Sequence, residues 1–417
     1  MSASLQKISV KEVEIASVFE ESRQLPIVSL QLIFKVSGSI KDGNLSGLAN
    51  ITASLLNEGT KELGSEKFSE QLEERAIHYS SGVGYETFVI HLDSLKENFS
   101  QGVKLVKKLL LDPNLDAEVL ERVKNRVISS ILQKESNFDY IASKELKKLI
   151  FKKTPIQNPK IGDIETIKKI ELKDIENFIK ENLVLSKVLP IIGGDLNSSE
   201  VESYLTELLS PLPVGKSEEI PYFELSEKSE NIVYKDTKQA YIYFASPLNV
   251  KYSSPDEVYK SKMMFFILGA SGFGSRLMEK IRVEKGLAYS VYASGKIDRT
   301  RSYFTGHLQT KLENLDEAKK IVIDEITKFL EGGATKEELD SAKSFILGSE
   351  PLRTETLSSR IGRSFNEIYK DYPLGHSVEE LKKIEALTLE ELNSFIKEHR
   401  EILNLSFSIV TANKEEK

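Results

Sequence analysis

The feature that most constrains the fold of this chain is an internal repeat with a period of about half its length. Lys168–Glu171 recurs as Lys382–Glu385 at an offset of 214 (382 − 168), and Phe178–Glu181 recurs as Phe395–Glu398 at an offset of 217 (395 − 178). Two tetrapeptides in the same order at nearly the same offset indicate a duplicated structural unit. The 417 residues also exceed the usual size of a single core, so we expect two domains.

The order of predicted elements is the same in both halves. Val89–Leu92 and Gly306–Gln309 each read as a strand that leads into an amphipathic helix, and later in the second half Thr335 and Glu338 form a capping box. Each half closes on an apolar run, predicted to be a buried strand, at Val188–Ile192 and Leu405–Val410. The pattern predicts an α+β fold of two tandem homologous domains, each an antiparallel-rich sheet packed with helices.

The boundary between the halves is predicted where proline and charge accumulate. The stretch 210–221 contains three prolines and reads as an exposed linker. We therefore expect an N-terminal domain over residues 1–209, a linker over 210–222 and a C-terminal domain over 223–417.

Composition excludes several classes of function. The net charge is −7 with acidic and basic residues interleaved, which argues against nucleic acid as a partner. No segment has the apolar length of a membrane span and the first residues lack the apolar run of a signal peptide, so we expect a cytoplasmic protein without membrane contact. The chain has no cysteine, which leaves His, Asp and Glu as metal ligands, and none of its five histidines has a partner at ligand spacing.

The most glycine-rich stretch, Gly269–Arg276, invites comparison with a phosphate-binding loop. It lacks the lysine that such a loop places after its last glycine, so nucleotide binding is a remote alternative. A turn that ends one helix and lets Ser275 cap the next is the simpler interpretation. Gly272 and Gly274 are retained as candidate substrate contacts.

Arg282 and Tyr289 follow this stretch at a helix-to-strand corner. The pattern predicts a helix from Ser275 that ends with Gly286 in the left-handed conformation, followed by a strand. A guanidinium and a phenol at such a corner could donate hydrogen bonds to a peptide carbonyl or an oxyanion. They could also serve only as a helix-terminal cation and a packed strand residue, and the residues alone favour this structural role.

The segments Gly274–Leu277 and Gly286–Ala293, with Arg282 between them, closely resemble the second-domain signature of the pitrilysin-type zinc peptidases, which include mitochondrial processing peptidase. The resemblance covers nearly the whole chain. It implies that the Arg and Tyr bind the substrate backbone and stabilise the tetrahedral intermediate. It also implies that the two domains form half of a clam-shell chamber.

The first half carries a degenerate form of the family's inverted zinc motif, H-x-x-E-H. Gly47–Thr60 matches its flanks, but Asn50 and Ser54 stand at the two His positions and Ala53 at that of the catalytic Glu. The position of the third ligand, a Glu on a later helix, is aligned with Ser130. The resemblance therefore implies that this chain has lost its metal site.

These patterns together predict the non-catalytic subunit of a heterodimeric zinc metallopeptidase. The chain would supply Arg282 and Tyr289 in trans to a homologous zinc-binding subunit and contact a peptide or an unfolded polypeptide. It would hold no cofactor, the zinc being in the partner, and it would be inactive alone, where it could form a homodimer. The alternative is a homodimeric peptide-binding or scaffold protein of the same fold without peptidase activity.

Overall fold

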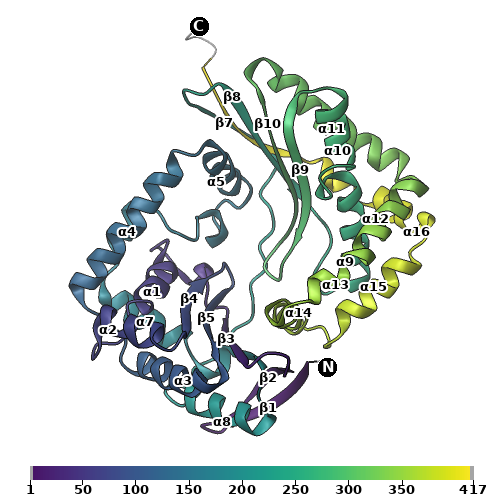
Figure 1. Ribbon diagram of the computed structural model, residues 1–417. Coiled ribbons are helices and arrows are strands. Elements are labelled where there is room, and N and C mark those ends of the chain that lie inside the picture. The colour runs from purple at the N-terminus through teal and green to yellow at the C-terminus, as the bar shows by residue number, and fades with distance from the viewer. Residues whose placement is uncertain (1–2, 414–417) are drawn as a thin grey trace. The chain divides into compact units, whose positions relative to one another are not determined.

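The computed structural model describes residues 3–413, which form two compact units (Figure 1). Neither unit is contiguous in sequence. Unit 1 contains the chain up to Leu132, Asn158–Ile220 and Pro351–His376, and unit 2 contains Gln133–Gln157, Pro221–Glu350 and the chain from Ser377. That residues 210–222 link the two repeated domains stays a prediction.

Unit 1 is built on a six-stranded sheet of order β1-β2-β6-β3-β5-β4. Its strands are β1 (Ser4–Val10), β2 (Val13–Glu21), β3 (Ile27–Lys35), β4 (His78–Val83), β5 (Thr87–Leu95) and β6 (Val188–Gly194). Its helices are α1 (Leu48–Leu56), α2 (Gly64–Glu73), α3 (Lys96–Leu111), most of α4 (Ala117–Glu135), α6 (Ile164–Ile167), α7 (Leu172–Asn182), α8 (Ser198–Leu209), most of α13 (Glu350–Thr354) and α14 (Leu357–Tyr369), with short 3₁₀ turns η1 (Ser39–Lys41) and η3 (Leu185–Lys187).

Unit 2 is built on a five-stranded sheet of order β7-β11-β8-β10-β9. Its strands are β7 (Glu230–Tyr234), β8 (Gln239–Pro247), β9 (Ala288–Ile297), β10 (Ser302–Lys311) and β11 (Ser406–Thr411). Its helices are α5 (Phe138–Ile150), α9 (Pro255–Phe265), α10 (Arg276–Met278), α11 (Leu315–Gly332), α12 (Lys336–Gly348), α15 (His376–Ala386) and α16 (Leu389–Glu398), with 3₁₀ turns η2 (Pro155–Gln157), η6 (Leu312–Asn314) and η7 (Arg400–Leu403) and two π-helical segments, η4 (Phe266–Ala270) and η5 (Glu279–Glu284).

The two sheets share one topology, which confirms the predicted fold class. In unit 1 the order β2-β6-β3-β5-β4 has a single parallel pair, β2 with β6, and unit 2 repeats it as β7-β11-β8-β10-β9 with β7 parallel to β11. The repeat is also in register. His91 pairs with Gln31 and Ser80, and His307 pairs with Tyr243 and Tyr292 on the equivalent strands.

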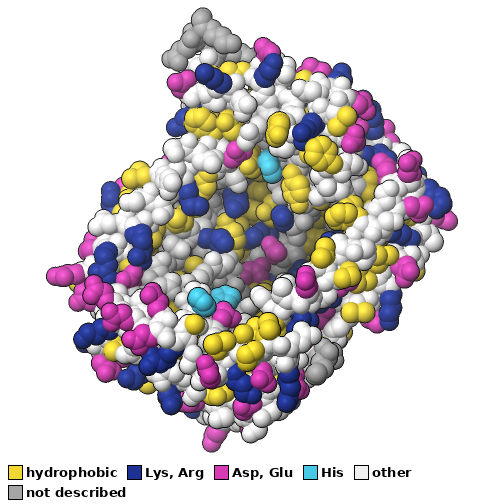
Figure 2. Space-filling view, viewed as in Figure 1, with side chains coloured by type: hydrophobic (Ala, Val, Ile, Leu, Met, Phe, Trp, Pro, Cys, Tyr) yellow, Lys and Arg dark blue, Asp and Glu magenta, His cyan; other side chains and the backbone are white. Residues whose placement is uncertain are grey.

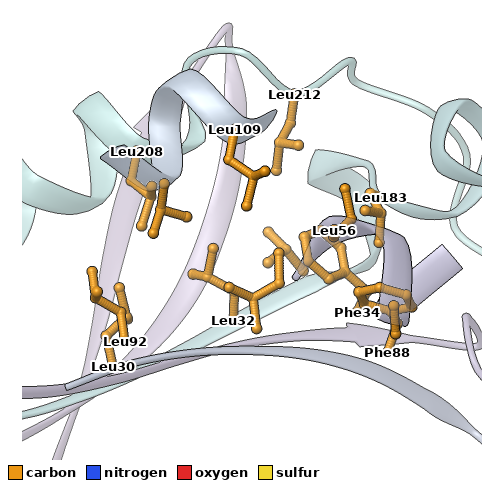
Figure 3. Packing of buried hydrophobic residues seen from close by; sticks show 14 of the residues in the cluster. Leu30, Leu32, Phe34, Leu56, Phe88, Leu92, Leu109, Leu183, Leu208 and Leu212 are labelled. Atoms are coloured by element: carbon orange, nitrogen blue, oxygen red, sulfur yellow. The ribbon is translucent and has the colours of Figure 1, made fainter. Parts of the chain in front are cut away.

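Each sheet packs one face against the main helices of its unit. In unit 1, the leucine and phenylalanine side chains of β3 and β5 point toward residues of α1, α3 and α8, as Figure 3 shows for Leu32, Leu56, Leu109 and Leu208. These side chains are at most 1% exposed. Fully burying one such side chain contributes about 1.5–3 kcal/mol, so this layer fixes the position of α1.

The opposite face of each sheet is partly covered by one helix from the other half of the chain. In unit 1, Leu357 and Ile361 of α14 pack with Leu189 and Ile191 of β6. In unit 2, Ile141 and Ala142 of α5 pack with Val410 of β11, a residue that is fully buried. Because the closing strands β6 and β11 are covered on both faces, every residue in them is buried, which explains their continuous apolar sequence.

The surface agrees with the composition. On the face shown in Figure 2, acidic and basic side chains are interspersed, and hydrophobic side chains lie between them, in places several together. No helix within residues 3–413 is both long enough and apolar enough to cross a membrane.

Candidate functional site

Helix α1 carries the degenerate motif, and its N-terminus is fixed by a buried carboxyl group. Asp42 accepts hydrogen bonds from the backbone N–H groups of Gly47 at 2.7 Å and Ala49 at 2.8 Å. Burial raises the pKa of Asp42 to about 7, although these two bonds act in the opposite direction. Gly47 has φ +96°, and a Cβ there would lie 2.6 Å from Ile167 Cδ1, so only glycine fits this start of the helix.

The motif positions present no group that zinc binds in proteins. Ala53 is buried, and Asn50 and Ser54 are partly exposed one turn apart. Ser130, on α4, donates its hydroxyl to the carbonyl of Arg126 at 3.0 Å. An amide, a methyl group and two hydroxyls replace the usual imidazoles and carboxylates. Across residues 3–413, no three His, Asp or Glu side chains are grouped to hold a metal ion.

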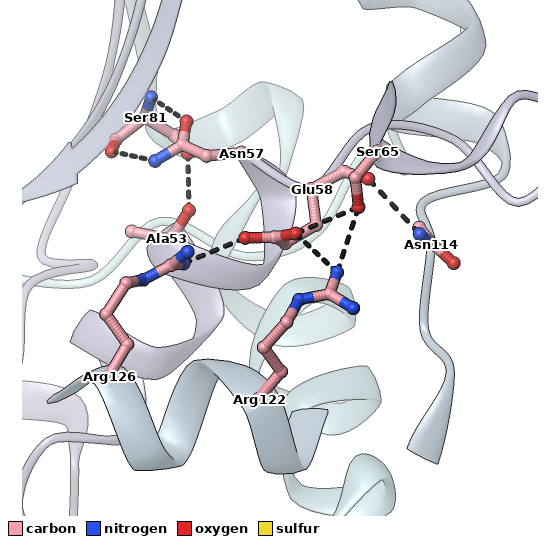
Figure 4. Close-up of polar contacts among 8 residues, drawn as sticks. All are labelled: Ala53, Asn57, Glu58, Ser65, Ser81, Asn114, Arg122 and Arg126. Atoms are coloured by element: carbon pink, nitrogen blue, oxygen red, sulfur yellow. Dashed lines mark hydrogen bonds and ion pairs between the residues drawn. The ribbon is translucent and has the colours of Figure 1, made fainter. Parts of the chain in front are cut away.

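A charged cluster that sequence reasoning missed lies at the C-terminal end of α1. Glu58, with a 9% exposed side chain, accepts hydrogen bonds from Arg122 and Arg126 of α4, each at 2.8 Å, and from Ser65 at 2.8 Å (Figure 4). Burial opposes ionisation, but the bonds from the two arginines and the serine outweigh it and lower the pKa of Glu58. The cluster joins α1 to α4, the two helices from which the zinc ligands would have come.

A second set of bonds joins α1 to the sheet. Ser81 of β4 donates its hydroxyl to the carbonyl of Ala53 at 2.7 Å, and Asn57 pairs with the backbone N–H and C=O of Ser81 (Figure 4). Ser81 and Asn57 therefore fix α1 against β4. Arg122 and Arg126 are spaced four apart on one helix face, which was a signal available in the sequence.

In unit 2, Arg282 lies in a π-helical turn. The sequence predicts a regular helix from Ser275, but regular α-helix is limited to α10 and the following residues form η5. Ser275 occupies the N-cap position, as predicted, but its hydroxyl makes no capping bond and donates to the carbonyl of Gly272 at 2.7 Å instead. Gly286 ends the helix at φ +62°, as predicted, and its N–H donates to the carbonyl of Arg282. A π turn rotates the side chains that follow it, and such turns are frequent at functional sites.

Tyr289 is placed by a β-bulge near the start of β9. The β9–β10 pairing runs from Val291 opposite Leu308 to Ala288 opposite Thr310, so Tyr289 and Ser290 both face Gln309. An extra residue bends the strand and re-aims the side chain that it carries. Tyr289 is 82% exposed as a result, which strand packing alone does not explain.

The π turn and the bulge bring Arg282 and Tyr289 together. The Arg282 guanidinium carbon lies 4.7 Å from the centre of the Tyr289 ring and 4.6 Å from the centre of the Phe273 ring. Within residues 3–413, the Arg282 guanidinium makes no hydrogen bond or ion pair, so its N–H groups are available to a ligand. Sequence reasoning missed Phe273, although an aromatic residue between two glycines was a usable signal.

The glycines around Phe273 have the conformations that only glycine adopts easily. Gly272 and Gly274 have φ of +71° and +85°, and a Cβ at either position would meet no atom within 4 Å. Their role as substrate contacts stays a prediction.

Comparison with known proteins identifies the family of this chain. Residues 17–164 match the family model described as insulinase, peptidase family M16, and residues 169–346 match the model described as the peptidase M16 inactive domain. The chain is 42% identical to the "Non-peptidase homolog YmxG" of Helicobacter pylori over 409 residues, 98% of this chain and 94% of the relative.

Solved structures share the complete fold. The crystal structure of a peptidase M16 inactive domain from Pseudomonas fluorescens has a TM-score of 0.91 with 26% identity and covers 99% of both chains. A protease from Helicobacter pylori has a TM-score of 0.85 with 17% identity, over 99% of this chain and all of the other. The expectation that this chain holds no cofactor agrees with the name of the first relative and with the description of the second family model. The chain belongs to peptidase family M16.

Proposed function

We propose that this chain is the partner subunit of a two-subunit zinc peptidase and contributes Arg282 and Tyr289 in trans. The zinc site would lie in a homologous polypeptide with an intact H-x-x-E-H motif. The substrate would be a peptide or an unfolded polypeptide.

The observation that carries this proposal is that the Arg282 guanidinium is unpaired. Its guanidinium is stacked between two rings, yet none of its N–H groups has an acceptor among residues 3–413. A structural arginine would ordinarily use several of its five donors within the protein, as Arg276 does in three hydrogen bonds to Glu338 and the carbonyl of Gly333. Donors that are pre-oriented and unused suit a peptide carbonyl.

The chemistry follows from where the two side chains can donate. The zinc ion of the partner would polarise the water that attacks the scissile carbonyl. Tyr289 would donate its phenol O–H to the oxyanion that forms, and Arg282 would hold a neighbouring carbonyl of the substrate. Both groups are fixed before substrate arrives, so little reorganisation is needed in the transition state.

The test is purification of the chain from its native host, followed by identification of what co-elutes. We expect a homologous chain of similar length that carries the zinc motif, with peptide cleavage by the complex and none by this chain alone. About one zinc per copy of this chain, resistant to mild chelation, would contradict the proposal. A stable homodimer that binds peptide without any zinc-bearing partner would favour the scaffold alternative.

A further inference from the structure

A pocket of about 560 Å³ opens in unit 2 beside the glycine loop. Its walls come from η4 and α12, where the rings of Phe266 and Phe345 lie 5.2 Å apart, together with Ile267 and Ala342. Phe345 is 57% exposed although its ring is part of this wall. Apolar side chains form one wall of this pocket and polar groups line the rest, which suits a ligand with both apolar and polar parts.

Phe273 links this pocket to Arg282. The Phe273 side chain lines the pocket and is also one of the two rings that sandwich the Arg282 guanidinium. It is 68% exposed, an unfavourable setting for a phenylalanine that has no ligand. Only the Phe273 ring separates the pocket from Arg282. A few residues of extended peptide are therefore long enough to contact both.

The polar part of the pocket is acidic. Glu337 and Glu338 line it and no lysine or arginine does. Arg276 neutralises Glu338 through two hydrogen bonds of 2.6 and 2.7 Å, whereas the exposed Glu337 has no ion-pair partner among residues 3–413. One uncompensated carboxylate beside the apolar wall of the pocket favours a cation on the ligand.

We propose that this pocket binds a large apolar side chain, aromatic or leucine-like, of the peptide whose backbone contacts Arg282 and Tyr289, and that Glu337 favours a lysine or arginine next to it. The inference rests on the proposed function, since it names the substrate class of the same site. It assigns Phe273 as the residue shared by the two contacts.

The test uses a positional-scanning library of fluorescein-labelled peptides and the full-length chain, alone and in the complex with its zinc-bearing partner. Ser341 lies on the exposed side of α12 and lines the pocket, so Ser341→Trp fills it without disturbing the core. Ser344, on the same helix, is exposed and does not line the pocket, which makes Ser344→Trp the matched control.

We expect the unmodified chain to prefer an aromatic residue or leucine at one position and a basic residue at its neighbour. Ser341→Trp should weaken binding of the preferred peptides by about tenfold and abolish the apolar preference, because the pocket is occupied. Ser344→Trp should change neither. Glu337→Lys should remove the basic preference and leave the apolar one intact, whereas Glu331→Lys, an exposed change outside the pocket, should remove neither.

Equal peptide profiles for Ser341→Trp and Ser344→Trp would overturn the pocket assignment, as would binding with no apolar preference. Arg282→Ala and Ser341→Trp test two separate claims, the role of Arg282 in peptide binding and the role of the pocket. If Ser341→Trp has no effect while Arg282→Ala weakens binding, the proposed function stands and this inference fails. If Ser341→Trp weakens binding and Arg282→Ala does not, the trans role of Arg282 fails. If no peptide binds in either assembly, both fail.

Discussion

The region around α1 and the region around η5 and β9 differ in whether their polar side chains are paired within the protein. Around α1, Glu58 and Asn57 are fully engaged with α4 and β4, and the motif positions offer no ligand. Around η5 and β9, Arg282 and Tyr289 are held by ring stacking and backbone geometry while their donors stay unused within residues 3–413. Polar groups satisfied inside the protein stabilise the fold, whereas exposed groups that are held in place but left unpaired suit binding.

The second region shows how such groups are held without hydrogen bonds. A π turn and a β-bulge each insert one residue into a regular element, and a left-handed glycine turns the chain between them. Together they bring the Arg282 guanidinium over the ring of Tyr289. A cation–π contact at an exposed site contributes about 0.5–1 kcal/mol, enough to orient Arg282 but not to compete with a substrate carbonyl.

The largest expected effect is that of Tyr289→Phe on the reconstituted complex. Removing one oxyanion donor should lower turnover by about 10²–10³-fold, with zinc content and subunit association unchanged, as measured by steady-state peptide cleavage. Tyr292→Phe is the matched control, because Tyr292 lies on the same strand beside His307. Normal cleavage by both Tyr289→Phe and Arg282→Ala would make the pair structural and favour the scaffold alternative.

Glu58→Ala should destabilise unit 1 by about 2 kcal/mol, since it removes charge-assisted bonds to a carboxylate that is nearly buried. Denaturant unfolding of the isolated chain measures this. Glu62, which pairs with Lys108 at an exposed position, is the control, and Glu62→Ala should cost less than about 0.5 kcal/mol. Equal effects of the two substitutions would show that the region around α1 is not held by this cluster.

Gly286→Ala should cost about 1 kcal/mol, because alanine is strained at φ +62° even where no atom obstructs its Cβ. It should also weaken peptide binding, since the residue sets the path from Arg282 to Tyr289. Gly43→Ala, at φ +56° and equally unobstructed in unit 1, should cost similar stability without affecting binding. Unchanged peptide binding in Gly286→Ala would show that the conformation of this turn is not needed for binding.

The smallest expected effect is a pH dependence confined to the first region. The pKa of Glu58 is lowered in the folded protein, so its contribution to stability is present above its ordinary pKa near 4.5 and is lost as the pH falls through the folded value. Glu58→Gln should therefore flatten the acid limb of a plot of unfolding free energy against pH. An unchanged acid limb in this variant would assign the dependence to other carboxyl groups.

Much of this architecture could be predicted from the sequence because it depends on local pattern. The apolar runs at Val188–Ile192 and Leu405–Val410 are strands, Thr335 and Glu338 form the predicted capping box, and Gly286 ends its helix. Recognising the degenerate motif required only the identity of the residues at positions 50, 53 and 54, since ligand chemistry is a property of the side chain itself.

Three features were decided only by tertiary structure. An amphipathic pattern specifies that α5 and α14 bury one face, but it does not say which sheet they cover, because either sheet offers the same kind of apolar surface. The cluster around Glu58 joins residues more than sixty positions apart.

The stack of Phe273, Arg282 and Tyr289 depends on a π turn and a bulge. Each of these changes the register by one residue. Periodicity assumes a constant register, so a sequence pattern cannot reveal contacts that exist because the register is broken.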